Sequence, residues 1–213
     1  EKQERPGAKL RASGGGRCNI ANTLSNEKFI ARFGRSGKFM IPALREFDHQ
    51  ALIAFFAEIG VACHAPDGYR IFPVTHQADT VADALTAELH KLGVELACKV
   101  KVQQIDCKDG AVTVVTTDKG SFSANKVILA SGGPGYPSLG ADASGYEFAA
   151  ALGHKIEELF PAMLPLTTRE TWVGRCRADT VGKVEMRINL PDAKKLQANG
   201  DLIFTENGIR GPV

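Results

Sequence analysis

A run of three glycines lies between residues that can bind an anion. Its members are Ser13, Gly14, Gly15, Gly16, Arg17, Cys18 and Asn19. Glycine has no Cβ, so the main chain can take a positive φ and approach a ligand closely. Ser13 and Asn19 can cap a helix start, and Arg17 adds a planar cation. These groups, with a helix N-terminus, suit a diphosphate, although a plain glycine turn explains the loop alone equally well.

A second glycine pair ends an apolar segment. Residues 126–133 read Lys-Val-Ile-Leu-Ala-Ser-Gly-Gly, a run without alternation that is typical of a buried parallel strand. Ligands of open α/β sheets lie outside the carboxyl ends of such strands. The pattern therefore predicts a buried strand that lets a dinucleotide approach Gly132 and Gly133, with an ordinary strand exit as the alternative.

The segment Gly34–Lys38 resembles a phosphate-binding loop only superficially. Arg32 stands where the first glycine is needed, and Phe39 replaces the Ser or Thr that would hold magnesium. We therefore interpret Arg32, Arg35 and Lys38 as a solvated face, and leave an anion contact open.

The histidines show no metal-binding spacing: His49, His64, His76, His90 and His154. His76 follows a Phe-Pro pair in an expected loop, so it has the best chance of facing a site, although a structural role is favoured. The sequence predicts no metal site.

The five cysteines form no CxxC pair. Their odd number and irregular spacing argue against a disulfide framework and a zinc ribbon, so reduced thiols are expected. Cys18 is either an activated thiol beside Arg17 or a thiol packed under a cofactor, and we favour the packed thiol. Cys98 and Cys107 are expected to be small core residues.

Length and composition describe an ordinary globular chain. It has 213 residues, of which 44% are hydrophobic and 23% charged. The net charge of +2 gives no reason to expect nucleic acid or an anionic membrane as a partner, and no apolar run can span a bilayer. We expect a cytoplasmic protein with a small-molecule substrate, and the oligomeric state stays open.

Helical signals dominate the first part of the chain. Residues 27–60 have a helical pattern, in which Asp48 is the expected N-cap and Gly60 the end of an amphipathic helix. Residues 61–65 and 69–72 read as short strands around a turn. A helix is expected over 79–92, with Leu85, Leu89 and Leu92 on its packed face and Gly93 at its end.

Strand signals dominate the later part. Segments 94–98, 101–106, 111–117 and 120–123 predict an antiparallel meander, with turns at Asp109–Gly110 and 118–120. A helix is expected over 144–152, and short strands over 166–168, 183–189 and 201–205. This pattern indicates a second, β-rich unit after a linker near Pro161 and Pro165.

Together these motifs resemble the bacterial flavoproteins described as BaiN-like or aminoacetone-oxidase-like NAD(P)/FAD-dependent oxidoreductases. The matching segments keep the family's order over nearly the whole chain: 9–22, 68–78, 129–133, 136–140, 145–146, 152–154, 165–168 and 202–212. The resemblance implies an α/β fold: a Rossmann-like FAD-binding domain with a small antiparallel meander over residues 1–163, and part of an inserted β-rich, barrel-like domain over 164–213.

The resemblance also implies FAD as the cofactor and NAD(P)H as a possible electron donor. Glu1 would hold the adenosine ribose, and Val102 would meet adenine through its backbone. Lys9 and the loop from Ser13 to Asn19 would line the ribose, diphosphate and flavin. The ADP portion would pack against Ala130, Gly132 and Gly133. No catalytic residue is assigned; the nearest candidates are Cys18, Asn19 and His76.

The segment Ala141–Gly145 departs from the family, which usually has Ala-Thr-Gly-Ser/Asp-Gly there; the added carboxylate and methyl group weaken a flavin contact. The chain starts without Met and stops in a turn, so we expect a fragment, with the family's GxGxxG strand before Glu1 and its closing segment after Val213. We expect flavin-mediated hydride or electron transfer on an unidentified small molecule. The alternatives are a non-enzymatic accessory flavin- or nucleotide-binding protein and an inactive truncated product.

Overall fold

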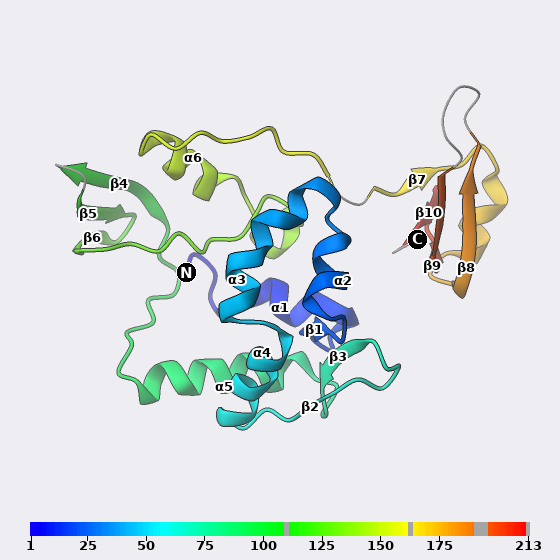
Figure 1. The fold of residues 1–213 in the computed structure, drawn as a ribbon. Coiled ribbons are helices and arrows are strands. Elements are labelled where there is room, and N and C mark those ends of the chain that lie inside the picture. The colour runs from blue at the N-terminus through cyan, green and yellow to red at the C-terminus, as the bar shows by residue number, and fades with distance from the viewer. Residues whose placement is uncertain (109–110, 162–163, 190–195, 212–213) are drawn as a thin grey trace. The chain divides into compact units, whose positions relative to one another are not determined.

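The computed structural model describes residues 1–108, 111–161, 164–189 and 196–211 (Figure 1). They form two compact units, Glu1–Ile156 and Glu157–Val213. The turn predicted at Asp109–Gly110 lies outside the described residues.

Six α-helices and three short 3₁₀ turns lie in the described residues of the first unit. They are α1 (Ala8–Ala12), α2 (Asn26–Ala31), α3 (Ile41–Glu46), α4 (His49–Glu58), α5 (Ala78–Lys91) and α6 (Ser144–Ala151), with 3₁₀ turns η1 (Ser13–Gly15), η2 (Gly34–Met40) and η3 (Pro137–Leu139). Helix α4 begins as predicted, because the Asp48 carboxylate accepts the amides of Gln50 and Ala51 at 2.9 and 3.0 Å. It ends just before Gly60, whose φ is 84°.

Helix α5 supplies much of the first unit's core. Ala78, Val81 and Ala82 are buried, and Val81 is 0% exposed. Leu92, which the periodicity placed on the packed face, is 67% exposed. That prediction is wrong because the core contacts α5 through its first half, whereas Leu92 follows the last helical turn.

Two small antiparallel sheets complete the first unit. Strands β1 (Ala21–Asn22) and β2 (Cys63–His64) flank β3 (Arg70–Pro73). The predicted meander is confirmed as β4 (Val102–Lys108), β5 (Ala111–Thr117) and β6 (Gly120–Ser123). Cys107 on β4 is exposed, so it is not the core residue that we expected.

Residues 94–98 form no strand, in contrast to the prediction. The N-terminal residues instead run beside this segment. The Val100 amide donates to the Glu1 carbonyl at 3.0 Å, and the Lys99 amide donates to the Gln3 carbonyl at 2.9 Å. Lys99 has a φ of 55°, which interrupts an extended chain before β4 begins.

The buried parallel strand predicted over 126–131 is also absent. These residues form no strand, and Ile128 is 89% exposed. A parallel strand needs hydrogen-bonding neighbours and cover on both faces. Every strand pair within the described ranges is antiparallel, so this segment has no such neighbour there.

The second unit is a four-stranded antiparallel sheet in the order β7-β10-β9-β8. Its elements are β7 (Leu166–Thr167), η4 (Thr171–Cys176), β8 (Thr180–Ile188), β9 (Leu196–Phe204) and β10 (Gly208–Arg210). Trp172 packs on Phe204 with ring centroids 5.8 Å apart, and Val173 is 3% exposed. The β-rich character predicted for this part of the chain is therefore confirmed.

In the described parts of the chain, no helix combines the length and apolar character needed to cross a membrane.

Candidate functional site

The glycine loop connects α1 to β1 and turns through left-handed backbone conformations. The φ angles of Gly14, Gly15 and Gly16 are 59°, 66° and 85°, and that of Cys18 is 60°. Such angles are costly for residues with a Cβ. The three glycines are therefore required by the path of the chain itself.

The glycines differ in their surroundings. A Cβ on Gly14 would lie 2.8 Å from the Asn19 amide nitrogen and 3.0 Å from the Phe72 ring, so Gly14 is needed for packing. A Cβ on Gly15 or Gly16 would meet nothing within 4 Å. The wall formed by Gly15 and Gly16 is therefore open backbone that a ligand can approach.

The loop also binds part of its own backbone. The amides of Gly16 and Cys18 both donate to the Ser13 carbonyl, at 3.1 and 3.0 Å. The Ser13 hydroxyl donates back to the Leu10 carbonyl at 2.8 Å. The loop thus follows the C-terminal end of α1, and the N-terminus of α5 meets it where the Ala78 amide donates to the Gly16 carbonyl.

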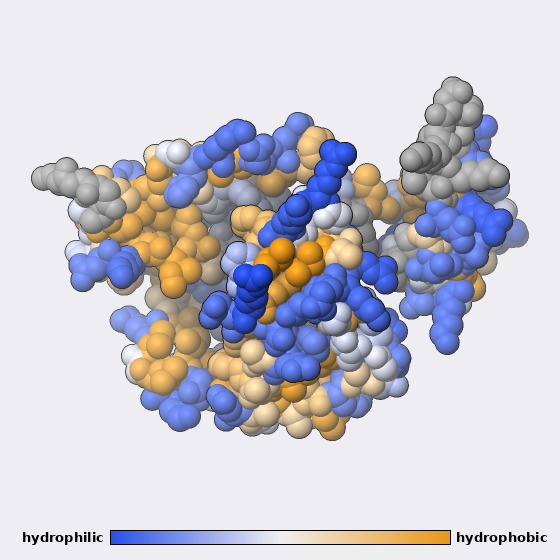
Figure 2. Space-filling model, in the orientation of Figure 1, coloured by the Kyte–Doolittle hydropathy of each residue, from blue (hydrophilic) through white to orange (hydrophobic). Residues whose placement is uncertain are grey.

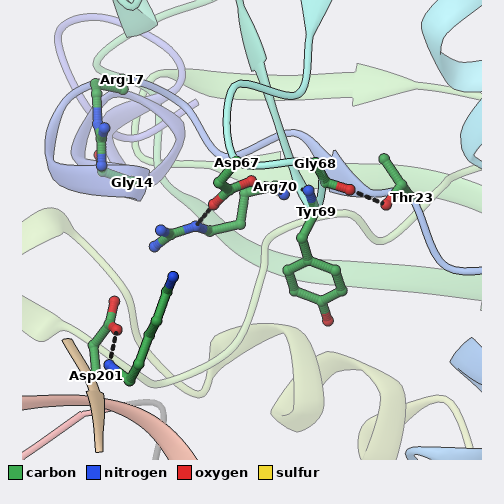
Figure 3. Close-up of polar contacts among 9 residues, drawn as sticks. Gly14, Arg17, Thr23, Asp67, Gly68, Tyr69, Arg70 and Asp201 are labelled. Carbon is green, nitrogen blue, oxygen red and sulfur yellow. Dashed lines mark hydrogen bonds and ion pairs between the residues drawn. The ribbon is translucent and has the colours of Figure 1, made fainter.

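Arg17 folds back over its own loop. Its Nε donates to the Gly14 carbonyl at 3.0 Å (Figure 3), and its guanidinium carbon lies 4.7 Å from the centroid of the Phe72 ring. This cation–π contact holds the charge beside the glycine wall. A positive charge in this place favours an anionic ligand on Gly15 and Gly16.

Cys18 is a packed thiol. It is 4% exposed and lies in a core with Phe56, Val61, Ala78 and Val81. Burial raises the pKa of its thiol, which the hydrogen bond with Ser13 only partly offsets. Of the two interpretations of Cys18, burial and the raised pKa favour the packed thiol over the activated nucleophile.

The hairpin β2–β3 carries Phe72 and is fixed by its turn. The Asp67 carboxylate accepts the amides of Tyr69 and Arg70 at 2.9 and 2.7 Å, and Arg70 Nε at 2.6 Å (Figure 3). The hydrogen bond with the Arg70 guanidinium holds the pKa of Asp67 well below its usual range. Thr23, just after β1, donates to the Gly68 carbonyl at 2.8 Å.

A histidine pair joins this hairpin to the turn that follows it: His64 lies on β2, and His76 lies just after β3. Nε2 of His64 and Nε2 of His76 are 2.9 Å apart, and the His76 ring lies 5.9 Å from that of Phe72. His76 has a φ of 52°, and the nearby Ala78 amide donates to the Gly16 carbonyl at 2.8 Å. His76, a candidate from the sequence, thus lies close to the loop, and His64 is its unforeseen partner.

Glu1 and the start of the meander are brought together. The Glu1 carbonyl accepts the amide of Val100, two residues before Val102, and the Glu1 carboxylate accepts the Gln3 amide at 2.7 Å. The residue expected on the ribose therefore lies near the residue expected at adenine. Lys9 is exposed on α1, and Asn19 is exposed after the loop.

The second glycine pair lies beside α6. Ala130, Gly132 and Gly133 follow an exposed segment in place of the buried strand that we expected. A cavity of about 560 Å³ is lined there by Leu129, Ser131, Gly132, Gly145, Tyr146, Ala149, His154 and Ile156. A Cβ on Gly145 would collide with the Ser131 hydroxyl, so this close approach requires glycine.

Asp142, the carboxylate that departs from the family pattern, has a structural role. It forms an ion pair with Lys2, and it accepts the Ser144 amide at 3.0 Å at the start of α6. The hydrogen bond with Lys2, followed by those from Ser144, holds the pKa of Asp142 well below its usual range. Asp142 thereby ties the N-terminal segment to α6.

A second cavity, of about 290 Å³, opens directly after the loop. Its lining residues come from β1 and α2 to α4: Ile20, Ala21, Asn22, Leu24, Asn26, Phe29, Leu44, Phe47, Asp48, His49 and Leu52. Most of the lining is apolar. Asn26 donates to the Leu44 carbonyl at 3.2 Å, and Asn22 accepts the Leu24 amide at 3.0 Å. The size is at the lower end for small-molecule pockets.

The described residues hold no cluster of three or more His, Cys, Asp or Glu that could bind a metal ion. The functional groups around the loop are thus open backbone, one restrained cation and a histidine pair. This arrangement suits the binding of a cofactor that brings its own chemistry.

Several known proteins are similar to this chain in sequence. The chain is 32% identical over 170 residues to the 3-dehydro-bile acid delta(4,6)-reductase of Clostridium scindens, covering 80% of this chain and 41% of that protein. It is 26% identical over 210 residues to the ribosomal RNA dihydrouridine synthase of Haemophilus influenzae, and 25% over 209 residues to that of Escherichia coli. These alignments cover 97% and 98% of this chain and 51% of each relative.

The chain therefore spans about half the length of the curated relatives that it matches. The model of the family described as HI0933-like protein Rossmann domain matches residues 1–208. Nearly the whole chain is included in that match. The protein is a member of the HI0933-like Rossmann domain family and has its α/β fold class.

Proposed function

We propose that this chain is part of an FAD-dependent reductase. The observation that carries the proposal is the open backbone wall of Gly15 and Gly16, flanked by the Arg17 cation. Family membership supports a dinucleotide as its ligand. Bound FAD would supply hydride transfer between a nicotinamide donor, NADH or NADPH, and an acceptor.

Different residues of this chain would contact different parts of the cofactor. Glu1 would accept hydrogen bonds from the adenosine ribose, and the backbone near Val102 would contact adenine. The glycine wall would hold the diphosphate. The ADP portion would also contact Ala130, Gly132 and Gly133. The packed Cys18 would support the loop from beneath, and His76 would lie at its edge.

The names of the relatives indicate the kind of acceptor. A delta(4,6)-reductase and a dihydrouridine synthase both add hydrogen across a carbon–carbon double bond. We therefore propose an electron-poor carbon–carbon double bond as the acceptor. The cavity of about 290 Å³ after the loop is large enough for a single ring system.

The test is anaerobic reduction of the flavin in the full-length protein. We expect NADH or NADPH to bleach the visible flavin absorption, and an unsaturated acceptor to restore it. An oxo-steroid with conjugated double bonds and a uridine-containing RNA are the two acceptors to compare. If flavin is bound but neither nicotinamide reduces it, the protein is an accessory flavoprotein and the reductase proposal fails.

A further inference from the structure

Helices α2 and α3 and the turn η2 between them form a cationic hairpin, residues 26–46. Its cations are Lys28, Arg32, Arg35, Lys38 and Arg45, all exposed, against two carboxylates, Glu27 and Glu46. This excess of positive charge is larger than the net charge of +2 of the whole chain. The net charge gave no reason to expect nucleic acid because it averages over the chain, whereas the charges gather here.

The hairpin cations are not neutralised by the protein. Some cations elsewhere in the described structure pair with carboxylates, as in Lys2–Asp142, Arg11–Asp79 and Lys99–Glu4. Within the described ranges, none of the five hairpin cations forms an ion pair. They are therefore available to a polyanion.

Exposed aromatic rings lie among these cations. Phe39, next to Lys38, is 87% exposed, and Phe33, next to Arg32, is 47% exposed. Figure 2 shows hydrophobic atoms flanked by hydrophilic ones over this part of the first unit. Aromatic rings between cations are the arrangement that binds single-stranded nucleic acid, because bases stack on the rings while phosphates meet the cations.

The hairpin has a defined shape. Gly37 is buried, and a Cβ there would collide with the Ile30 carbonyl, so η2 packs tightly on α2. Asn26 of α2 donates to the Leu44 carbonyl of α3 at 3.2 Å, and Phe33 meets Phe29 edge-on at 5.2 Å. Phe29 and Leu44 also line the cavity of about 290 Å³, so the cationic surface borders that pocket.

We propose that the cationic hairpin is an RNA-docking surface that brings a base of single-stranded RNA to the pocket beside it. This inference rests on the proposed reductase function and specifies its acceptor as a nucleobase. Two relatives named as ribosomal RNA dihydrouridine synthases, aligned over nearly all of this chain, support RNA as the polyanion. The exposed Phe39 favours bases over a carboxylate-rich protein surface, which has nothing to stack on it.

The test is fluorescence anisotropy of the full-length protein with a labelled, uridine-containing single-stranded RNA of about 16 nucleotides. We expect Arg32→Gln/Arg35→Gln/Lys38→Gln to weaken RNA binding at least about tenfold. The slope of log affinity against log salt concentration should become shallower by about two. Phe39→Ala should weaken binding by roughly tenfold with an unchanged salt slope.

The matched control is Lys91→Gln/Lys99→Gln/Lys119→Gln, which removes the same charge elsewhere in the first unit. We expect it to leave affinity within about twofold. Equal weakening by both triple variants would overturn the proposal, since binding would then follow net charge alone. Failure of the wild type to bind RNA, or binding only to vesicles of anionic phospholipid, would also overturn it.

Flavin content and nicotinamide-dependent bleaching, measured in the same variants, separate the two proposals. Normal flavin behaviour without RNA binding rejects only the docking surface. Absence of flavin from every variant and from the wild type rejects the reductase function on which the docking proposal rests.

Discussion

At the scale of residues, the glycines of the loop lack a side chain for two different reasons. Gly14 lacks room for a Cβ, because Asn19 and Phe72 are close, whereas Gly15 and Gly16 face open space. All three also need a positive φ. A substitution at Gly15 therefore tests ligand approach, provided that the backbone strain is controlled separately.

Gly15→Val should abolish FAD binding by the full-length protein, because the branched side chain would cover the backbone that the diphosphate approaches. Gly93→Val is the matched control: Gly93 has a φ of 70° and open surroundings, like Gly15 with 66°, but ends α5 away from the loop. Both variants should lose about 1–2 kcal/mol of stability from strain. Stoichiometric FAD retained by Gly15→Val would show that the loop is not a cofactor cradle.

Some roles of single residues could be predicted from the sequence, and others could not. The glycine run and Asp48 were readable because their roles follow from local backbone chemistry. The contact of His64 with His76 was not readable, since it depends on the β2–β3 pairing and on the left-handed φ of His76. The hairpin turn at residues 66–68 is the signal that brings these two segments together.

At the scale of elements, α5 shows that the bounds of a helix can be predicted correctly while its buried face is predicted incorrectly. The helix was predicted within one residue at each end, from its periodicity and from Gly93. Leu92 was nevertheless placed on the packed face, because periodicity does not show how far the core extends along a helix. The structure places the contact at Ala78, Val81 and Ala82.

Val81→Ala should therefore destabilise the protein by about 1–2 kcal/mol. It removes two buried methyl groups and leaves a cavity, which the better helix propensity of alanine offsets in part. Leu92→Ala, although it removes more carbon atoms, should change the free energy of unfolding by less than about 0.5 kcal/mol. Urea denaturation of both variants measures this, and a larger loss in Leu92→Ala would contradict the packing described for α5.

The start of α6 makes stability depend on pH through Asp142. Its pKa is lowered in the folded protein by Lys2 and Ser144, relative to about 3.9 when unfolded. The stabilisation is therefore complete above about pH 4 and is lost as the pH falls below that value. Asp142→Asn should lower Tm at pH 6 by a few degrees and flatten the decrease in Tm between pH 5 and 3.

Glu147→Gln, a change of the same kind on the exposed face of α6, is the control for Asp142. It should leave the pH profile of Tm unchanged. An identical profile for wild type and Asp142→Asn would show that the contact with Lys2 does not contribute to acid sensitivity.

At the scale of the whole molecule, the described chain would supply one side of the proposed cofactor site. The loop, the N-terminal segment and the glycine pair at 132–133 all belong to the first unit, Glu1–Ile156. The strand expected over 126–131 illustrates why the sheet could not be predicted from its own residues. Its apolar pattern is typical of a central strand, but strand formation depends on neighbours, and the described residues supply none.

Since the chain spans about half the length of its curated relatives, the complete site must be examined in the full-length protein. The α/β class, the meander, the β-rich second unit and the family were all readable, because each rests on local patterns or on a specific motif. The cavity after the loop was not, because residues of several separate elements form its walls.

The most direct measurement is the visible absorption spectrum of the full-length protein, purified gently and then recorded again after addition of FAD. We predict flavin bands with a stoichiometry near one FAD per chain, which disappear on denaturation as the flavin is released. The absence of flavin bands in both spectra, after removal of unbound FAD, would contradict the claim that the loop from Ser13 to Asn19 is one wall of an FAD site.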